Sequence, residues 1–204
     1  MYYHVVVWRK VCFILILLAG LSACSNWTGD GNAVSDKVDR MVIEIWSPMQ
    51  SADADTLILD QVSVFNDNQR NIKVKLTLIE PASYTQVLAK ARQDKQLPAV
   101  VSLDLTQLAV FVEAGLLAPL DKMMSQRLWQ DLLPDVLEQG HIGTHVYAVP
   151  AVHKSDKKLL WGVLHEAEDK AATMAFVHYL LHPDQQRPAV KIGYTEAITY
   201  SAME

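Results

Sequence analysis

Hydrophobic and polar residues follow two different periods along the chain, which predicts strands and helices in turn. Residues 41–46 form an apolar segment, and positions 72, 74, 76 and 78 are apolar with polar residues between them, as in a half-buried strand. Between these segments, apolar residues from Ala54 to Phe65 recur every three or four positions. This spacing predicts a helix, and Ser51 is placed to cap its first turn.

The same order of elements continues through the chain. We expect a helix with a capping box at Ser83 and Gln86, a strand at 99–103, a helix after Asp104 that ends at Gly115, short helical pieces at 128–137, and a helix at 168–181 that Pro183 stops. Strands that alternate with helices predict an α/β fold, in which helices cover both faces of a mostly parallel sheet.

Two apolar runs later in the chain raise a separate question. Residues 146–149 and 159–164 each have the character of a strand, and a short polar stretch joins them. The joint is either an ordinary hairpin, with a turn at Ser155 and Asp156, or the place where a longer segment has been lost.

The first 23 residues have the pattern of an export signal. Arg9 and Lys10 precede an apolar stretch that is too short to span a bilayer, and the stretch ends in Leu-Ser-Ala before Cys24. Small residues before a cysteine resemble the lipobox of bacterial lipoproteins, with Cys24 as the lipidated residue. A plain secretory signal and an uncleaved anchor are the alternatives. We therefore expect a signal peptide at 1–23, a flexible tether at 24–40 and a folded body at 41–204, anchored by lipid outside the cytoplasm, on the periplasmic face in a Gram-negative host.

Composition narrows the function. The chain is 50% hydrophobic and 20% charged, as in a globular domain, and removal of Arg9 and Lys10 would lower its net charge from −5 to −7. This acidic balance argues against nucleic-acid binding. Cys24 would be the only cysteine of the mature chain, so neither a disulfide within one molecule nor a cysteine metal site is expected. No glycine-rich phosphate loop is present, and we expect no cofactor.

Open α/β sheets bind ligands at the carboxyl ends of their strands, which selects the candidate site. The residues at these ends that could contact a small solute are Trp46, Ser47, Asp104, Thr106 and Tyr147. The aromatic rings would stack on an apolar face of the solute, and the polar groups would form hydrogen bonds with it. Two alternatives stay open: Trp46 could belong to the core, and Asp104 could serve only as a helix cap.

Histidine and carboxylate patterns give little support to catalysis. His178 and His182 are four residues apart on an expected helix, as in two-histidine zinc sites, but local spacing supplies no third ligand. A solvated helix edge is the favoured interpretation. Because no Ser/His/Asp set or carboxylate pair has a recognisable context, we expect neither a metal site nor an enzyme.

Several phrases, taken in order, resemble the extracellular solute-binding proteins of bacterial ABC importers, the maltose-binding-like family 1. These phrases are Ile-Glu-Ile-Trp-Ser at 43–47, Phe-Asn at 65–66 with Ile-Lys-Val-Lys at 72–75, Pro-Ala-Val-Val at 98–101, Glu-Ala-Gly-Leu-Leu-Ala-Pro-Leu-Asp at 113–121, Val-Tyr-Ala-Val-Pro at 146–150, and residues 159–185. The resemblance implies a periplasmic-binding-protein-like fold with sheet order second, first, third, returning, fourth, in which only the returning strand is antiparallel.

The resemblance also answers the question of the joint. Members of the family have two lobes, and a long second-lobe segment separates the strands that here are joined by residues 151–158. The chain therefore resembles the first lobe alone, with the returning strand brought back by a hairpin. The function that the resemblance implies is weak binding of a small solute, a carbohydrate in view of the family, for an ABC permease. The alternative is an interaction module or a non-functional remnant.

Overall fold

The computed structural model describes residues 40–153 and 157–204, and in this part the predicted alternation of strands and helices is confirmed. The main elements are β1 (Met41–Pro48), α2 (Ala52–Asn68), β2 (Ile72–Ile79), α3 (Pro81–Asp94), β3 (Val100–Leu103), α4 (Leu105–Glu113), β6 (Ala148–His153), β7 (Lys158–Val163), α7 (Lys170–Leu181) and α8 (Pro183–Lys191). Shorter elements are α5 (Gln126–Asp131), α6 (Pro134–Leu137), the 3-10 turns η1 (Glu138–Gly140) and η2 (Tyr200–Ala202), and the ribbon of β4 (His141–Ile142) and β5 (His145–Val146).

The main sheet has five strands in the order β2-β1-β3-β7-β6. β1 pairs in parallel with β2 and β3, while β7 is antiparallel to both β3 and β6. This is the expected order with the returning strand as the antiparallel member. The carboxyl ends of β1, β2, β3 and β6 therefore lie at one edge of the sheet, which we call the carboxyl edge.

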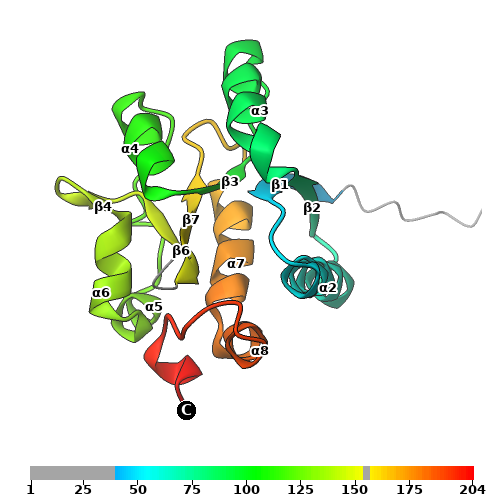
Figure 1. Cartoon of the computed structure of the whole chain (residues 1–204), viewed down its shortest axis with the longest axis vertical. Coiled ribbons are helices and arrows are strands. Elements are labelled where there is room, and N and C mark those ends of the chain that lie inside the picture. Colours follow the sequence, from blue (N-terminus) through cyan, green and yellow to red (C-terminus); the bar gives the residue numbers. More distant parts are fainter. Residues whose placement is uncertain (1–39, 154–156) are drawn as a thin grey trace, which may run out of the picture. The chain divides into compact units, whose positions relative to one another are not determined.

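Helices cover both faces of this sheet (Figure 1). On one face, α3 and α4 bury Tyr84, Leu88 and Leu108 against Val101 and Leu103 of β3 and against neighbouring side chains. On the other face lies a larger core, in which residues from α2 and α7 pack on the sheet together with side chains of the α5–α6 region. We call these the α3–α4 side and the α2–α8 side. Because helices cover both faces of the sheet, the side chains of the central strand β3 are buried on either side.

The two apolar runs around residue 150 pair as neighbouring antiparallel strands, as predicted. Val149 faces Trp161 and His153 faces Lys158, with a bulge between Pro150 and Val152. The expected bounds of the fourth strand were shifted, however. Val146 belongs to β5, and β6 begins only at Ala148, because the chain first makes a tight β4–β5 ribbon around Gly143, whose φ is +65°.

The two outermost strands of the sheet, β2 and β6, contain charged residues and a bulge, respectively. β2 exposes Lys73 and Lys75, and Lys75 forms an ion pair of 2.7 Å with Glu44 on β1. At the other edge, β6 contains Pro150 and the bulge that follows it.

Two helix starts differ from the sequence-based expectation. α3 begins at Pro81, two residues before the expected capping box, and Ser83 inside the first turn donates to the Glu80 carbonyl at 3.0 Å. Pro183 does not only follow the end of α7, since it also begins α8. Proline is favoured at the first position of a helix because its missing N–H has no partner there and its φ is already helical.

Some expectations fall outside the described residues. These are the signal peptide at 1–23, nearly all of the tether at 24–40, lipidation of Cys24, and the turn at Ser155 and Asp156. Within residues 40–153 and 157–204, no helix has both the length and the apolar character that crossing a membrane requires.

Candidate functional site

Trp46 is half-buried and packs on the α3–α4 side of the sheet. Its carbonyl oxygen accepts a hydrogen bond of 3.1 Å from the Tyr84 hydroxyl, which also lies 2.8 Å from the Ser102 carbonyl. Burial raises the pKa of Tyr84, so this hydroxyl stays protonated and joins β1 to β3. Trp46 is therefore partly a core residue, as one of the two sequence-based alternatives had it.

Asp104 is the N-cap of α4, as expected. Its carboxylate accepts from the Gln107 amide N–H at 2.7 Å, and the Gln107 side chain accepts from the Asp104 N–H at 3.1 Å, which completes a capping box. The Gln107 side chain also donates to Thr85 at 3.0 Å. Thr106 is exposed in the first turn of the same helix. The structure thus gives Asp104 a structural role, and a role in ligand binding stays a prediction.

Tyr147 does not lie at the end of a strand, contrary to the expectation. Because β6 begins at Ala148, Tyr147 precedes the strand and lies toward its amino end. Trp46 lies on β1, and Tyr147 directly precedes β6. β3 and β7 lie between these two strands, so the backbones are three strand spacings apart, roughly 14 Å. The two aromatic residues are therefore too far apart to stack on one sugar ring.

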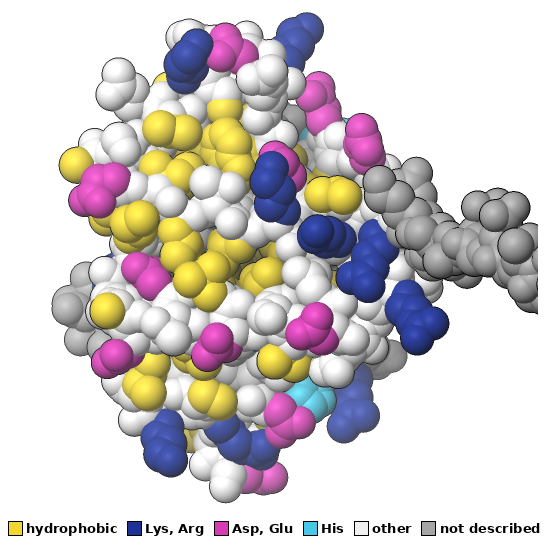
Figure 2. Space-filling view, turned by 90° about the vertical axis from the view of Figure 1, so that its right-hand side faces the viewer, with side chains coloured by type: hydrophobic (Ala, Val, Ile, Leu, Met, Phe, Trp, Pro, Cys, Tyr) yellow, Lys and Arg dark blue, Asp and Glu magenta, His cyan; other side chains and the backbone are white. Residues whose placement is uncertain are grey.

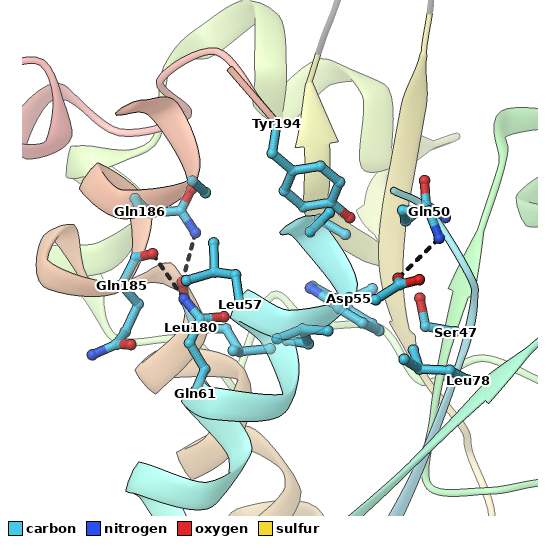
Figure 3. A pocket seen from close by; sticks show the side chains of 15 residues that line it. Ser47, Gln50, Asp55, Leu57, Gln61, Leu78, Leu180, Gln185, Gln186 and Tyr194 are labelled. Atoms are coloured by element: carbon cyan, nitrogen blue, oxygen red, sulfur yellow. Dashed lines mark hydrogen bonds between the residues drawn. The ribbon is translucent and has the colours of Figure 1, made fainter. Parts of the chain in front are cut away.

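Ser47 lies on the opposite face from Trp46, because successive side chains of a strand point to opposite sides. It is buried, and it lines a small cavity at the carboxyl edge on the α2–α8 side (Figure 3). The cavity is lined by parts of β1, β2, β6, β7, α2, α7 and α8, by Gln50 between β1 and α2, and by Tyr194 after α8. Its lining is Ser47, Gln50, Ala54, Asp55, Leu57, Ile58, Gln61, Leu78, Ala151, Trp161, Leu180, Gln185, Gln186, Ala189 and Tyr194.

The ends of two helices place the polar groups of this cavity. Ser51 caps α2 by accepting from the Ala54 N–H, which sets Asp55 in the first turn. α8 ends at Lys191 and is followed by Gly193, whose φ is +68°, and the Tyr194 N–H donates to the Ala189 carbonyl at 2.9 Å. This left-handed C-terminal turn directs the chain back, so that the Tyr194 side chain reaches the start of α2 (Figure 3).

Several polar atoms in the cavity lack protein partners. The Asp55 carboxylate accepts from the Gln50 N–H at 2.9 Å through one oxygen. The side-chain oxygens of Gln50 and Gln186 are buried and have no hydrogen-bond partner among the described residues. Burial, and after it the negative charge of Asp55, raises the pKa of Tyr194. Buried acceptors without partners cost free energy, so the cavity is suited to a molecule that donates hydrogen bonds.

The cavity is small, with a volume of about 40 Å³. A water needs roughly 10–15 Å³ on the same measure, so there is room for a few waters or for one polar substituent of a larger solute. A complete sugar ring does not fit inside. A solute bound here would insert one group and leave most of its surface at the mouth of the cavity.

The sequence analysis missed most of this site, including Gln50, Asp55, Gln186 and Tyr194. One available signal was the order of Pro183, a polar run and Gly193, which is typical of a helix with a proline start and a glycine end. That pattern predicts α8, although it does not predict which side chains α8 brings to α2.

His178 and His182, the pair considered as metal ligands, do not lie on the same helix. His178 is partly buried in α7, and this burial lowers its pKa. α7 ends at Leu181, so His182 lies outside it and instead accepts from the Asp184 N–H at 3.3 Å as the cap of α8. Within the described part of the chain, no group of three or more His, Cys, Asp and Glu side chains is arranged to hold a metal ion.

A larger groove of about 870 Å³ lies opposite the carboxyl edge, at the end of the sheet where β1 begins and β7 ends. Arg92 and Lys95 at the end of α3 line it, as do Glu166 and Glu168 before α7. No sequence-based expectation pointed to this edge. Figure 2 shows the side of the molecule that carries β2, α2 and α3, where hydrophobic side chains gather within a border of charged ones. The large exposed hydrophobic residues include Val42 of β1 and Leu59 and Val64 of α2.

Comparison with known proteins gives a likeness of fold. No family model matches the chain, and no curated protein matches its sequence. Among solved structures, the cyclic alpha-maltosyl-1,6-maltose binding protein of Arthrobacter globiformis is similar, with 18% identity, a TM-score of 0.50, and coverage of 54% of this chain and 28% of that one.

Two further structures are a family 1 extracellular solute-binding protein of Alicyclobacillus acidocaldarius and the maltotriose binding protein of Thermus thermophilus. Their identities are 19% and 20%, their TM-scores are 0.49 and 0.48, and they match 55% and 54% of this chain. The match spans less than a third of each of these three proteins. The mixed sheet, its order and the Arthrobacter comparison show that the described residues have a periplasmic-binding-protein-like α/β fold.

Proposed function

We propose that the described residues form a solute-binding lobe whose ligand lies at the carboxyl edge on the α2–α8 side. The observation that carries this proposal is the cavity in which Ser47, Gln50, Asp55 and Tyr194 meet beside the apolar Leu57. Ligand sites in open α/β sheets occur at this edge, and they combine apolar walls with a few convergent polar groups.

We infer that the ligand is a carbohydrate or a similar hydroxylated solute, and that the protein binds it without catalysing a reaction. Two kinds of support agree: the resemblance of the sequence to sugar-binding components of ABC importers, and the fold that the chain shares with a maltose-derivative binding protein. Sugar hydroxyls can donate to the free side-chain oxygens of Gln50 and Gln186. Delivery to an ABC permease is the physiological role that this proposal implies.

The affinity should be low when only this lobe contacts the solute. Association costs at least about 4 kcal/mol before any contact is counted. A hydrogen bond exposed to water contributes about 1 kcal/mol, and the 40 Å³ cavity takes only one substituent. We therefore expect a Kd in the millimolar range or weaker.

Saturation-transfer difference NMR tests this proposal, because it detects weak binding. The full chain in detergent micelles would be titrated with maltotriose and with glucose. We expect a saturable signal that weakens in Gln50→Leu and persists in Asp53→Asn, an exposed position of α2 that does not line the cavity. No signal with either sugar would contradict carbohydrate binding. A micromolar Kd would contradict binding by one wall and would favour a second wall supplied by a partner.

The proposed location is outside the cytoplasm, with a lipid on Cys24 as the membrane anchor. The support is the sequence pattern that ends at Cys24, where small residues follow an apolar stretch. Cys24→Ala should leave the protein unprocessed or released from the membrane fraction. Normal processing and unchanged fractionation of that variant would contradict the anchor.

A further inference from the structure

We propose that the cavity at the carboxyl edge is selective for a primary ammonium group on the solute, which Asp55, Gln50 and Ser47 would bind. This inference rests on the proposed solute-binding function and adds a charge preference that neither the fold nor the comparisons give.

The first support is a carboxylate that has no ion-pair partner among the described residues. The cavity lining contains the carboxylate of Asp55 and no Lys, Arg or His side chain. None of the ion pairs formed by the described residues includes Asp55. One carboxylate oxygen accepts from the Gln50 N–H, and the other has no protein donor among the described residues. A cation in the cavity would therefore meet an attractive charge, whereas an anion would meet repulsion from Asp55 and no cationic side chain in the lining to offset it.

The second support is the number of acceptors. An ammonium group has three N–H donors and no acceptor, so a site that fits it must offer about three oxygens. The buried side-chain oxygen of Gln50 has no partner, and the Ser47 hydroxyl makes only a long contact of 3.4 Å with the Pro48 carbonyl. With the free oxygen of Asp55 these make three. Figure 3 shows Ser47, Gln50 and Asp55 together at one end of the cavity, with the Tyr194 hydroxyl directed toward them.

The third support is the environment of the charge. Tyr194 and Leu78 form part of the wall at this end of the cavity, and Leu57 lines it nearer to Gln186. An apolar wall lowers the local dielectric, which strengthens the attraction between a carboxylate and an ammonium group. Burial and the Asp55 charge raise the pKa of Tyr194, so its hydroxyl stays neutral and adds no second negative charge.

The size of the cavity sets what can enter. About 40 Å³ admits an ammonium group with one or two waters, but not the sugar ring that carries it. The solute class is therefore an amino-substituted sugar or a similar hydroxylated amine, with the ring at the mouth of the cavity.

Three sugars of nearly equal shape test the inference with the unaltered full chain. Glucosamine carries the ammonium group at pH 6, glucose has a hydroxyl in its place, and N-acetylglucosamine has a neutral amide. Ligand-observed NMR titration in detergent micelles would give the three Kd values. Because hydrogen bonds between charged groups are stronger than neutral ones, we expect glucosamine to bind about tenfold more tightly than the other two.

Two matched variants locate the preference. Asp53 and Asp55 both lie in the first turn of α2, and only Asp55 lines the cavity. Asp55→Asn should reduce the ratio of glucose to glucosamine Kd to about one, while Asp53→Asn should keep it near ten. A thermal unfolding curve for each variant checks that it is folded, and the comparison of sugars in the unaltered chain needs no variant.

The outcomes separate the two proposals. Equal binding of glucose and glucosamine would overturn the ammonium preference and leave the solute-binding function standing. Binding of none of the three sugars would overturn both. A preference for glucosamine that survives in Asp55→Asn would place the charge elsewhere and overturn the assignment of this cavity, whatever the result for Asp53→Asn.

Discussion

The two sides of the sheet differ most at the carboxyl edge. On the α3–α4 side, the Tyr84 hydroxyl contacts two backbone carbonyls, and Asp104 and Gln107 complete each other's hydrogen bonds. On the α2–α8 side, the side-chain oxygens of Gln50 and Gln186 are buried without partners. Polar groups that satisfy one another stabilise a fold, whereas polar groups left unsatisfied are available to a ligand. The comparison therefore gives the polar groups of the α3–α4 side a structural role and supports the proposal that a ligand binds on the α2–α8 side.

The largest expected contrast comes from leucines on the two sides. Leu88 is fully buried on the α3–α4 side, and Leu57 is only partly buried beside the cavity. Leu88→Ala should lower the free energy of unfolding by about 2–5 kcal/mol, because it leaves a void in a packed core. Leu57→Ala should cost clearly less. Urea denaturation followed by fluorescence measures both, and equal losses would remove the contrast.

A smaller effect is expected from the hydroxyl of Tyr84. Tyr84→Phe keeps the ring but removes the donor that joins the Trp46 and Ser102 carbonyls. We expect a loss of about 1–3 kcal/mol in the free energy of unfolding, because buried acceptors are left without a partner. Tyr200→Phe, at a half-exposed position, is the control and should be near neutral. A neutral Tyr84→Phe would mean that the α3–α4 side does not depend on this bond.

Alkaline pH tests both sides together. Burial raises the pKa of Tyr84 and of Tyr194 above the ordinary value of 10.0, so the unfolded chain loses these protons first as the pH rises. The stabilisation is fully present below pH 10 and declines above it, by about 1.4 kcal/mol per pH unit for each tyrosine. Denaturation at pH 9 and at pH 11 should show this fall, and Tyr84→Phe or Tyr194→Phe should reduce it. An unchanged slope in both variants would contradict the burial of these hydroxyls.

Removal of the Asp104 side chain should have a smaller effect on the free energy of unfolding than removal of the Tyr84 hydroxyl. Asp104→Ala removes the cap of α4 and should lower the free energy of unfolding by about 1 kcal/mol. Because its carboxylate is occupied by Gln107, we expect the NMR signal of bound sugar to remain. Loss of that signal in a variant that is still folded would indicate that Asp104 binds the ligand, as the sequence analysis proposed.

The smallest change is expected at Gln186. Gln186→Met removes a buried oxygen without a partner, together with a hydrogen bond of 2.6 Å to the Leu180 carbonyl. These two effects oppose each other, so the free energy of unfolding should change by less than about 1 kcal/mol. Sugar binding should nevertheless weaken. A large loss of stability with unchanged binding would show that Gln186 serves the core.

The sequence predicted the fold better than the site. Alternation of apolar residues depends on local periodicity, so β1, α2, β2 and the pairing of β6 with β7 could be foreseen from short segments. The cavity instead depends on Tyr194 reaching Asp55, nearly 140 residues away, and no local pattern carries that contact. Trp46 and Ser47 were grouped because they are neighbours, although their side chains lie on opposite faces of the sheet. Tyr147 was misplaced because the β4–β5 ribbon moves the start of β6 by two residues.

The two outer strands have a consequence for solubility. An open sheet exposes unpaired backbone groups at its edges, where a strand from another molecule can add and begin aggregation. β6 is covered at its edge, because η1 and α6 pack against it and Pro150 is buried. β2 instead exposes Lys73 and Lys75, whose charges oppose the approach of a like strand. Substitution of these two lysines by uncharged strand residues should therefore make β2 a surface for intermolecular β-pairing, independently of any ligand.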